Sequence, residues 1–150
     1  MQVSHKIFTV ALSTTFVSVA FRHWEVGLVT LALAVPYYVY WALNHDICKH
    51  RLEAFAIFIL LMSFTISTFS VIYEMEGILC NGALVNNTYE SFYFSIVTWT
   101  TLGYGDCLPT ENIRHIAALE ALFGYIMMAI FMSLFLAVFN SRTAVVDKDA

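Results

Sequence analysis

The chain has 150 residues, of which 60% are hydrophobic and 12% are charged, and its formal net charge is −4. A soluble domain carries about 25% charged residues, so this composition argues against a soluble globular protein. We expect a lipid bilayer as its environment and no nucleic-acid partner.

Four apolar runs follow one another along the chain. Three have at least 18 residues, about the length that crosses a hydrocarbon core of ~30 Å at ~1.5 Å per residue. These three runs are Val26–Leu43, Ala54–Tyr73 and Ile116–Phe139. The first run, Ile7–Phe21, reaches a spanning length only with its flanks. A soluble bundle with buried helices would not supply three runs this long, so we predict an all-α membrane protein with four transmembrane helices.

The first run has an alternative interpretation as a cleaved signal peptide. Lys6 provides a basic start, and Ser18-Val19-Ala20 provides a site of small residues. Several hydroxyl side chains make the run rather polar for a signal core, and such hydroxyls often form helix–helix contacts in membranes. We therefore retain a transmembrane helix, and cleavage of residues 1–20 stays open.

The first two helices, within residues 1–52, carry no evident chemistry. A voltage sensor needs a helix with several regularly spaced arginines, but neither Ile7–Phe21 nor Val26–Leu43 contains Lys or Arg. Pro36 predicts a kink in the second helix. This segment is therefore predicted not to sense voltage.

The segment Thr88–Trp99 is too short to cross a membrane. Asn87 can cap its start, and Glu90 follows three positions later, as expected at a helix N-terminus. Twelve helical residues extend only ~18 Å. We predict that this helix dips into the membrane and that the chain then returns outward.

A glycine-rich run, Thr100-Thr101-Leu102-Gly103-Tyr104-Gly105-Asp106, follows the dipping helix. Glycine adopts backbone conformations that other residues avoid. Alternated with larger residues, the two glycines permit an extended strand whose carbonyl groups all turn to one side. Four such strands around an axis would form rings of oxygen atoms able to replace the water shell of K⁺.

These residues resemble the selectivity filter of the tetrameric potassium channel superfamily. Residues 55–140 are similar to the outer helix, pore helix, filter and inner helix of small prokaryotic and two-pore-domain-type channels. The resemblance implies a homotetramer that binds K⁺ as the permeant ion, with no organic cofactor and no catalytic residue. The residues that it assigns to K⁺ coordination are Thr101, Leu102, Gly103, Tyr104 and Gly105.

The resemblance also implies a set of supporting residues around the filter. These are Asp106, Thr100, Trp99, Phe94 and Glu120. The Tyr104 side chain is expected to pack on Phe94 or Trp99. Val97 replaces an acid that pairs with the post-filter aspartate in some family members. Asp106 therefore lacks that partner, and the Trp99 N–H is one candidate to bond it, with plain packing of Trp99 as the alternative.

The last predicted helix carries a candidate hinge and cavity face. From Gly124, the residues Met128, Met132 and Leu136 recur every four positions, which is typical of one helix face. That face either lines the cavity or packs on another helix, and Gly124 either bends the helix or permits close contact. Glu120 either bonds the pore helix or reaches water at the interface.

The distribution of basic residues predicts the orientation, with both termini cytoplasmic in a plasma (inner) membrane. The inside then holds Lys6, Lys49, Arg51, Arg142 and Lys148, and the outside holds Arg22 and Arg114. Cys80 and Cys107 face outside, where a disulfide between them, one across subunits, and free thiols all remain open.

The sequence thus predicts non-voltage-sensing helices at 1–52, a pore domain at 53–140 and a short cytoplasmic tail at 141–150, with no soluble regulatory domain. The predicted function is passive, K⁺-selective conduction rather than enzymatic catalysis. The alternatives are a nonselective cation channel and a non-conducting accessory or scaffold subunit that uses the pore fold. The stimulus that opens the pore (pH, tension, lipid or a partner) stays open.

Overall fold

The computed structural model describes residues 24–44 and 51–146. Four α-helices, three short strands and one 3₁₀ turn make up this part of the chain. In chain order they are α2 (Trp24–Asn44), α3 (Arg51–Glu76), β1 (Ile78–Cys80), β2 (Ala83–Val85), α4 (Thr88–Trp99), β3 (Cys107–Pro109), η1 (Glu111–Ile113) and α5 (Arg114–Val146).

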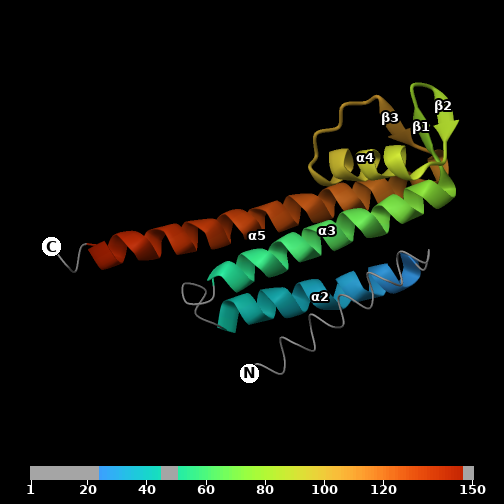
Figure 1. The fold of residues 1–150 in the computed structure, drawn as a ribbon. Helices are drawn as coiled ribbons and strands as arrows, with labels where there is room; N and C mark the ends of the chain where they lie inside the picture. The colour runs from blue at the N-terminus through green and yellow to red at the C-terminus, as the bar shows by residue number, and fades with distance from the viewer. Residues whose placement is uncertain (1–23, 45–50, 147–150) are drawn as a thin grey trace.

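The three long helices lie side by side, and the short one covers an end of this layer. Helix α3 runs along α5, α2 packs on α3, and α4 lies over the N-terminal part of α5 beside the strands (Figure 1). Two helical segments in the described residues, Ala54–Glu76 and Glu111–Ser133, are long and apolar enough to cross a membrane. The apolar part of α2, Glu25–Tyr40, is shorter. The predicted helix at Ile7–Phe21 lies outside the described residues.

Helices α2, α3 and α5 each cover the apolar run that predicted them, and α4 covers the short segment that was predicted from its cap. Helix α4 begins and ends at the predicted residues, and α3 and α5 extend beyond their runs into polar flanks. Helix α2 is one continuous helix that contains Pro36. These four helices are thus confirmed in the described part of the chain.

The described part of the chain is mostly helical, as predicted, but it also contains a small sheet that the sequence did not predict. It is a three-stranded antiparallel sheet in the order β2-β1-β3, with β1 and β2 between α3 and α4 and with β3 after the glycine-rich run. Strand β1 pairs with β2 through a tight turn at Asn81 and Gly82, whose φ angles are 51° and 80°. Two consecutive positive φ angles are typical of the hairpin turns that match strand twist, and Asn-Gly is the preferred pair there.

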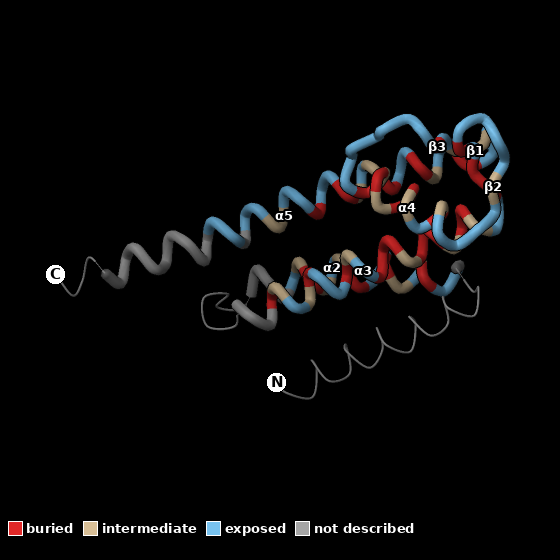
Figure 2. The backbone as a smooth tube through the Cα atoms, turned by 45° about the horizontal axis from the view of Figure 1, so that its top comes forward, coloured by how far each residue is buried: buried red, intermediate tan, exposed pale blue. Residues whose placement is uncertain are grey.

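The buried side chains form two clusters, one that includes residues 54–66 of α3 and one that includes residues 64–73. The first, called here the Trp99 cluster, contains Ala34, Tyr38, Ala54, Phe58, Leu61, Ile66, Trp99 and Met127. The second, called the Tyr73 cluster, contains Leu31, Phe64, Phe69, Ile72, Tyr73, Ile78, Cys80, Phe94, Cys107, Ile113 and Ala117. Buried positions gather where α3, α4 and the start of α5 meet, whereas α5 is largely exposed farther along, up to Leu136 (Figure 2). This packing fixes α4 and the segment that follows it.

Candidate functional site

Helix α4 is defined at its start by a side-chain cap. The Asn87 Oδ1 atom accepts a hydrogen bond of 2.8 Å from the Glu90 backbone N–H, and the Asn87 backbone is extended. Such a cap satisfies one of the amide donors that the first turn of a helix leaves unpaired. The predicted N-terminus of this helix is therefore confirmed.

The start of the glycine-rich run is hydrogen-bonded to the last turns of α4. The Leu102 N–H donates to the Val97 carbonyl at 3.0 Å, and the Thr101 N–H donates to the Thr98 carbonyl at 3.0 Å. The Thr100 hydroxyl donates to the Ile96 carbonyl at 2.7 Å. These bonds satisfy carbonyls at the helix C-terminus and set the direction in which the chain leaves it.

The backbone after α4 alternates in handedness. Thr101, Gly103 and Gly105 have φ angles of 58°, 56° and 83°, whereas Leu102 and Tyr104 between them have negative φ. An added Cβ would meet no atom within 4 Å at either glycine, so their backbone conformation, rather than crowding, is what calls for glycine. All five residues are exposed in the single chain.

Asp106, directly after this run, is held by three separate bonds. Its Oδ2 accepts from the Tyr93 hydroxyl at 2.7 Å, its Oδ1 accepts from the Cys107 N–H at 3.0 Å, and its carbonyl accepts from the Asn81 N–H at 2.8 Å. The bond from Tyr93 holds the pKa of Asp106 below its ordinary value. The same bond raises the pKa of Tyr93 to about 12.

Tyr93 is a contact that the sequence did not predict, and it replaces the candidate bond from Trp99. The Trp99 side chain is 1% exposed inside its cluster, and its Nε1 has no hydrogen-bond partner in the described part of the chain. Tyr93 lies six residues before Trp99 on α4, and no local pattern links it to Asp106 thirteen residues later.

The expected packing of Tyr104 on pore-helix aromatics does not occur within one chain. The Phe94 ring instead packs edge-on against Tyr73, with 4.8 Å between ring centroids. Tyr104 is 68% exposed, whereas Phe94 and Trp99 are buried in the two clusters. Both rings are buried because they cover α3 and α5, which leaves Tyr104 outside.

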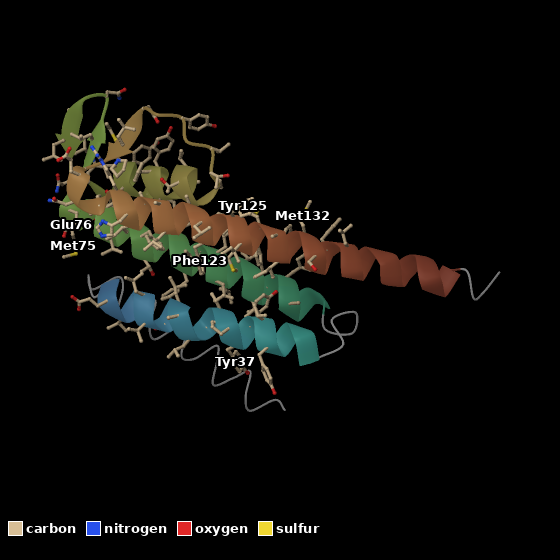
Figure 3. All side chains as sticks on the ribbon, turned by 180° about the vertical axis from the view of Figure 1, so that it is seen from behind. Tyr37, Met75, Glu76, Phe123, Tyr125 and Met132 are labelled. Carbon is tan, nitrogen blue, oxygen red and sulfur yellow. A yellow bond between two sulfur atoms is a disulfide. The ribbon has the colours of Figure 1, made fainter. Side chains whose placement is uncertain are left out.

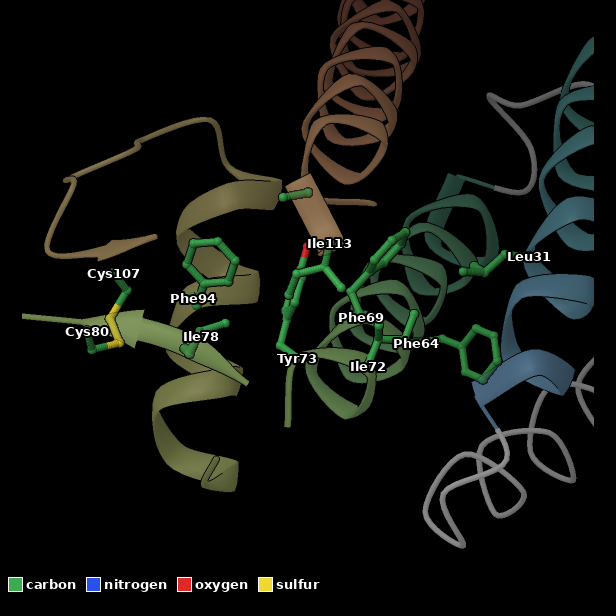
Figure 4. Close-up of a cluster of buried hydrophobic side chains, with 11 residues drawn as sticks. Leu31, Phe64, Phe69, Ile72, Tyr73, Ile78, Cys80, Phe94, Cys107 and Ile113 are labelled. Atoms are coloured by element: carbon green, nitrogen blue, oxygen red, sulfur yellow. A yellow bond between two sulfur atoms is a disulfide. The ribbon is translucent and has the colours of Figure 1, made fainter. Parts of the chain in front are cut away.

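A disulfide connects the residue after Asp106 to strand β1. Cys80 in β1 is bonded to Cys107 in β3, and the bridge lies at the edge of the Tyr73 cluster (Figure 4). The sequence left this pairing open against free thiols and a bridge between subunits. The bridge ties the residue after Asp106 to the β1–β2 hairpin.

Glu120 in α5 is completely buried. Its Oε1 lies 2.6 Å from the Ser95 hydroxyl of α4, and its Oε2 accepts from the Tyr73 hydroxyl of α3 at 2.5 Å. The alternative in which Glu120 reaches water at the interface is therefore wrong. The side chain bonds a pore-helix hydroxyl, as the other alternative expected.

Gly124 and the methionines have different surroundings in the single chain. It is buried against the Trp99 backbone, whereas Met128, Met132 and Leu136 are about half exposed. A spacing of four residues turns about 40° past a full turn at each step, so the four positions drift around the helix. Figure 3 shows Met132 on α5, and Phe123, which is only partly buried, is packed against the Trp99 cluster.

Two comparisons with known proteins place this site. A family model described as "Ion channel" matches residues 54–141, which include most of α3, all of α4, the glycine-rich run and most of α5. The protein "Two pore potassium channel a" of Oryza sativa subsp. japonica is 31% identical over 84 residues, which are 55% of this chain and 23% of the relative. The chain therefore matches less than a quarter of that relative's length. No solved structure matches this chain.

Proposed function

We propose that this chain, which belongs to the ion channel family and within it to the potassium channel superfamily, conducts K⁺ passively through residues Thr101–Gly105. The observation that carries the proposal is the alternation of positive and negative φ along these five residues. Such alternation lets successive carbonyl groups turn toward one side of an extended strand. Carbonyl oxygens arranged in this way replace the hydration shell of a cation.

Four copies of the chain would be needed, because one chain supplies one strand. The side chains of Leu102 and Tyr104 are more than half exposed in the single chain, and assembly around an axis would cover them. The half-exposed Met128, Met132 and Leu136 would then line an apolar cavity below the strands. We therefore propose a homotetramer in the plasma membrane, with both termini cytoplasmic.

The site has electrostatic features that favour a cation. Helix α4 ends directly before the strand, so the partial negative charge of its C-terminus lies near the start of the proposed ion path. Asp106 carries its charge at the other end, where the hydrogen bond from Tyr93 keeps the pKa low. Both charges would attract a cation and repel an anion.

The proposal is tested by the purified full-length chain in liposomes. We expect ⁸⁶Rb⁺ uptake by the protein alone and a reversal potential that follows the K⁺ gradient when Na⁺ replaces K⁺ on one side. A reversal potential indifferent to that exchange would assign a nonselective cation channel. An absence of uptake would favour the accessory or scaffold subunit, and a monomeric or dimeric particle would contradict the tetramer.

Two glycines provide a matched pair of variants. Gly103 and Gly82 both have positive φ, and an added Cβ would meet no atom within 4 Å at either. Gly103→Ala and Gly82→Ala therefore impose a similar backbone strain, on the order of 1–2 kcal/mol. We expect only Gly103→Ala to change the K⁺/Na⁺ permeability ratio, since Gly82 lies in the β1–β2 turn. Equal effects of the two variants on that ratio would contradict the assignment.

A further inference from the structure

The carboxyl group of Glu120 connects three helices. Its two oxygens contact the Tyr73 hydroxyl of α3 and the Ser95 hydroxyl of α4, while Glu120 itself belongs to α5. Figure 4 shows Tyr73 in its cluster between α3 and α4. Ser95 is completely buried and lies five residues before Thr100, so this group is bonded to the helix that leads into the proposed ion path.

The Ser95 hydroxyl has two hydrogen-bond partners but a single proton. The Ser95 Oγ lies 2.6 Å from Glu120 Oε1 and 3.0 Å from the Ile66 carbonyl oxygen. A hydroxyl has one proton to donate, and a carbonyl oxygen can only accept. If Ser95 donates to Ile66, the short contact with Glu120 needs a proton on Glu120.

The surroundings of Glu120 offer no compensating positive charge. The titratable group that faces it from α3 is Tyr73, and Ser95 from α4 does not titrate in the accessible range. In the part of the chain that the structure describes, Arg114 at the start of α5 pairs with Glu111 of η1, and no cation pairs with Glu120. A buried carboxylate without a cation is strongly unfavourable, whereas a neutral acid that is fully hydrogen-bonded is not.

We propose that Glu120 is a neutral carboxylic acid in the folded protein, which donates to Ser95 and accepts from Tyr73. Ser95 then donates to the Ile66 carbonyl, so a continuous set of bonds joins α5, α4 and α3. Glu120 is thereby a positioning residue for α4, the helix that leads directly into residues Thr101–Gly105 and is hydrogen-bonded to them. Its effect on conduction rests on the function proposed above, but its protonation does not.

Infrared spectroscopy tests the protonation directly. The carbonyl stretch of a protonated acid is separate from the bands of a carboxylate. We expect the spectrum of the full-length protein at pH 7 to contain an acid band that Glu120→Gln removes. The matched control is Glu76→Gln, because Glu76 is an exposed carboxyl group at the end of α3 (Figure 3). Loss of carboxylate bands alone in Glu120→Gln would overturn the proposal.

The same variants separate a neutral from an ionised Glu120 in function. In Glu120→Gln, the amide N–H can donate to Ser95 and the amide oxygen can accept from Tyr73, as in the neutral acid. We expect this variant to keep the K⁺/Na⁺ permeability ratio of the unaltered chain, whereas Glu120→Leu lowers it. A loss of selectivity in Glu120→Gln as large as in Glu120→Leu would overturn the proposal. If the unaltered chain conducts nothing, the proposed function fails, and the infrared result still decides the protonation.

Discussion

The Cα atom of Gly124 lies directly against the backbone carbonyl of Trp99. A Cβ added at Gly124 would overlap the Trp99 carbonyl oxygen and come within 2.9 Å of the carbonyl carbon. Helix α5 therefore touches the end of α4 at a point where no side chain fits. The close-contact role that the sequence left open for this glycine is the one that the structure shows, and the hinge role stays a prediction.

Gly124→Ala should destabilise the protein. The clashing atoms belong to the backbone and cannot rotate away, and overpacking of this kind costs about 1–3 kcal/mol. The cost should exceed the gain of about 1 kcal/mol in helix propensity from glycine to alanine. Thermal unfolding in detergent measures the change. Ala129→Ser, which adds one atom at an exposed position of α5, should have almost no effect. A Gly124→Ala variant more stable than the unaltered chain would contradict the contact.

Removal of the Cys80–Cys107 disulfide should lower stability by about 2–4 kcal/mol. The bridge closes a segment with a sequence separation of 27 residues, and such a constraint restricts the unfolded chain. Cys80→Ser should lower the unfolding temperature, and reduction of the unaltered protein should do the same. The thiol count after alkylation, with and without reductant, checks the pairing. Cys48→Ser is the control, and two additional free thiols in the unreduced protein would rule out the bridge.

Tyr93→Phe should raise the pKa of Asp106 toward its ordinary value of ~3.9. The Tyr93 hydroxyl donates to the carboxylate and is the largest cause of its lowered pKa. Because the ionised carboxylate accepts this bond, the bond stabilises the folded protein fully above pH ~3.9. That stabilisation is lost as the pH falls through the lowered pKa of Asp106. Tyr93→Phe has no such bond, so this acid-dependent loss of stability should not occur in the variant.

Carbon NMR of labelled aspartates measures the titration, and Asp106→Asn assigns the signal. Tyr89→Phe is a suitable control, because Tyr89 is an exposed tyrosine on the same helix. An unchanged Asp106 titration in Tyr93→Phe would show that the bond does not persist in solution. On the alkaline side, the Tyr93 pKa of about 12 keeps the donor protonated through neutral pH.

Asn87→Ala should destabilise α4 by about 1 kcal/mol. The substitution removes the side-chain oxygen that accepts from the Glu90 N–H, and N-cap replacements of this kind cost about 0.5–2 kcal/mol. Asn87→Asp retains the acceptor and should stay close to the unaltered chain. Thermal unfolding of both variants makes the comparison, and equal stabilities would indicate that the cap contributes nothing.

Several elements were predictable because their signals are local. The cap at Asn87 lies within a few residues of the helix it starts, and the long apolar runs predicted α2, α3 and α5. The sheet was missed because each of its strands has three residues, too few for an alternating pattern. The Asn81-Gly82 pair was a usable hairpin signal.

The contacts of the candidate site were harder to predict. Tyr93 and Asp106 are 13 residues apart, and Tyr73 and Glu120 are 47 apart. No sequence period connects such pairs, because the partner depends on which helices pack together. The candidate bond from Trp99 to Asp106 and the alternative in which Glu120 reaches water were wrong for this reason, since both side chains are buried between helices.

By itself, the sequence determined that the chain has membrane-length helices, a short capped helix and a glycine-rich segment after it. Those features depend on the apolar character, length and backbone freedom of neighbouring residues, which can be read directly. Only the tertiary structure decided that Glu120 lies buried between α3 and α4, that Tyr93 bonds Asp106, and that Gly124 meets Trp99. Those choices follow from helix packing, where burial makes each polar group take whichever partner the neighbouring helix presents.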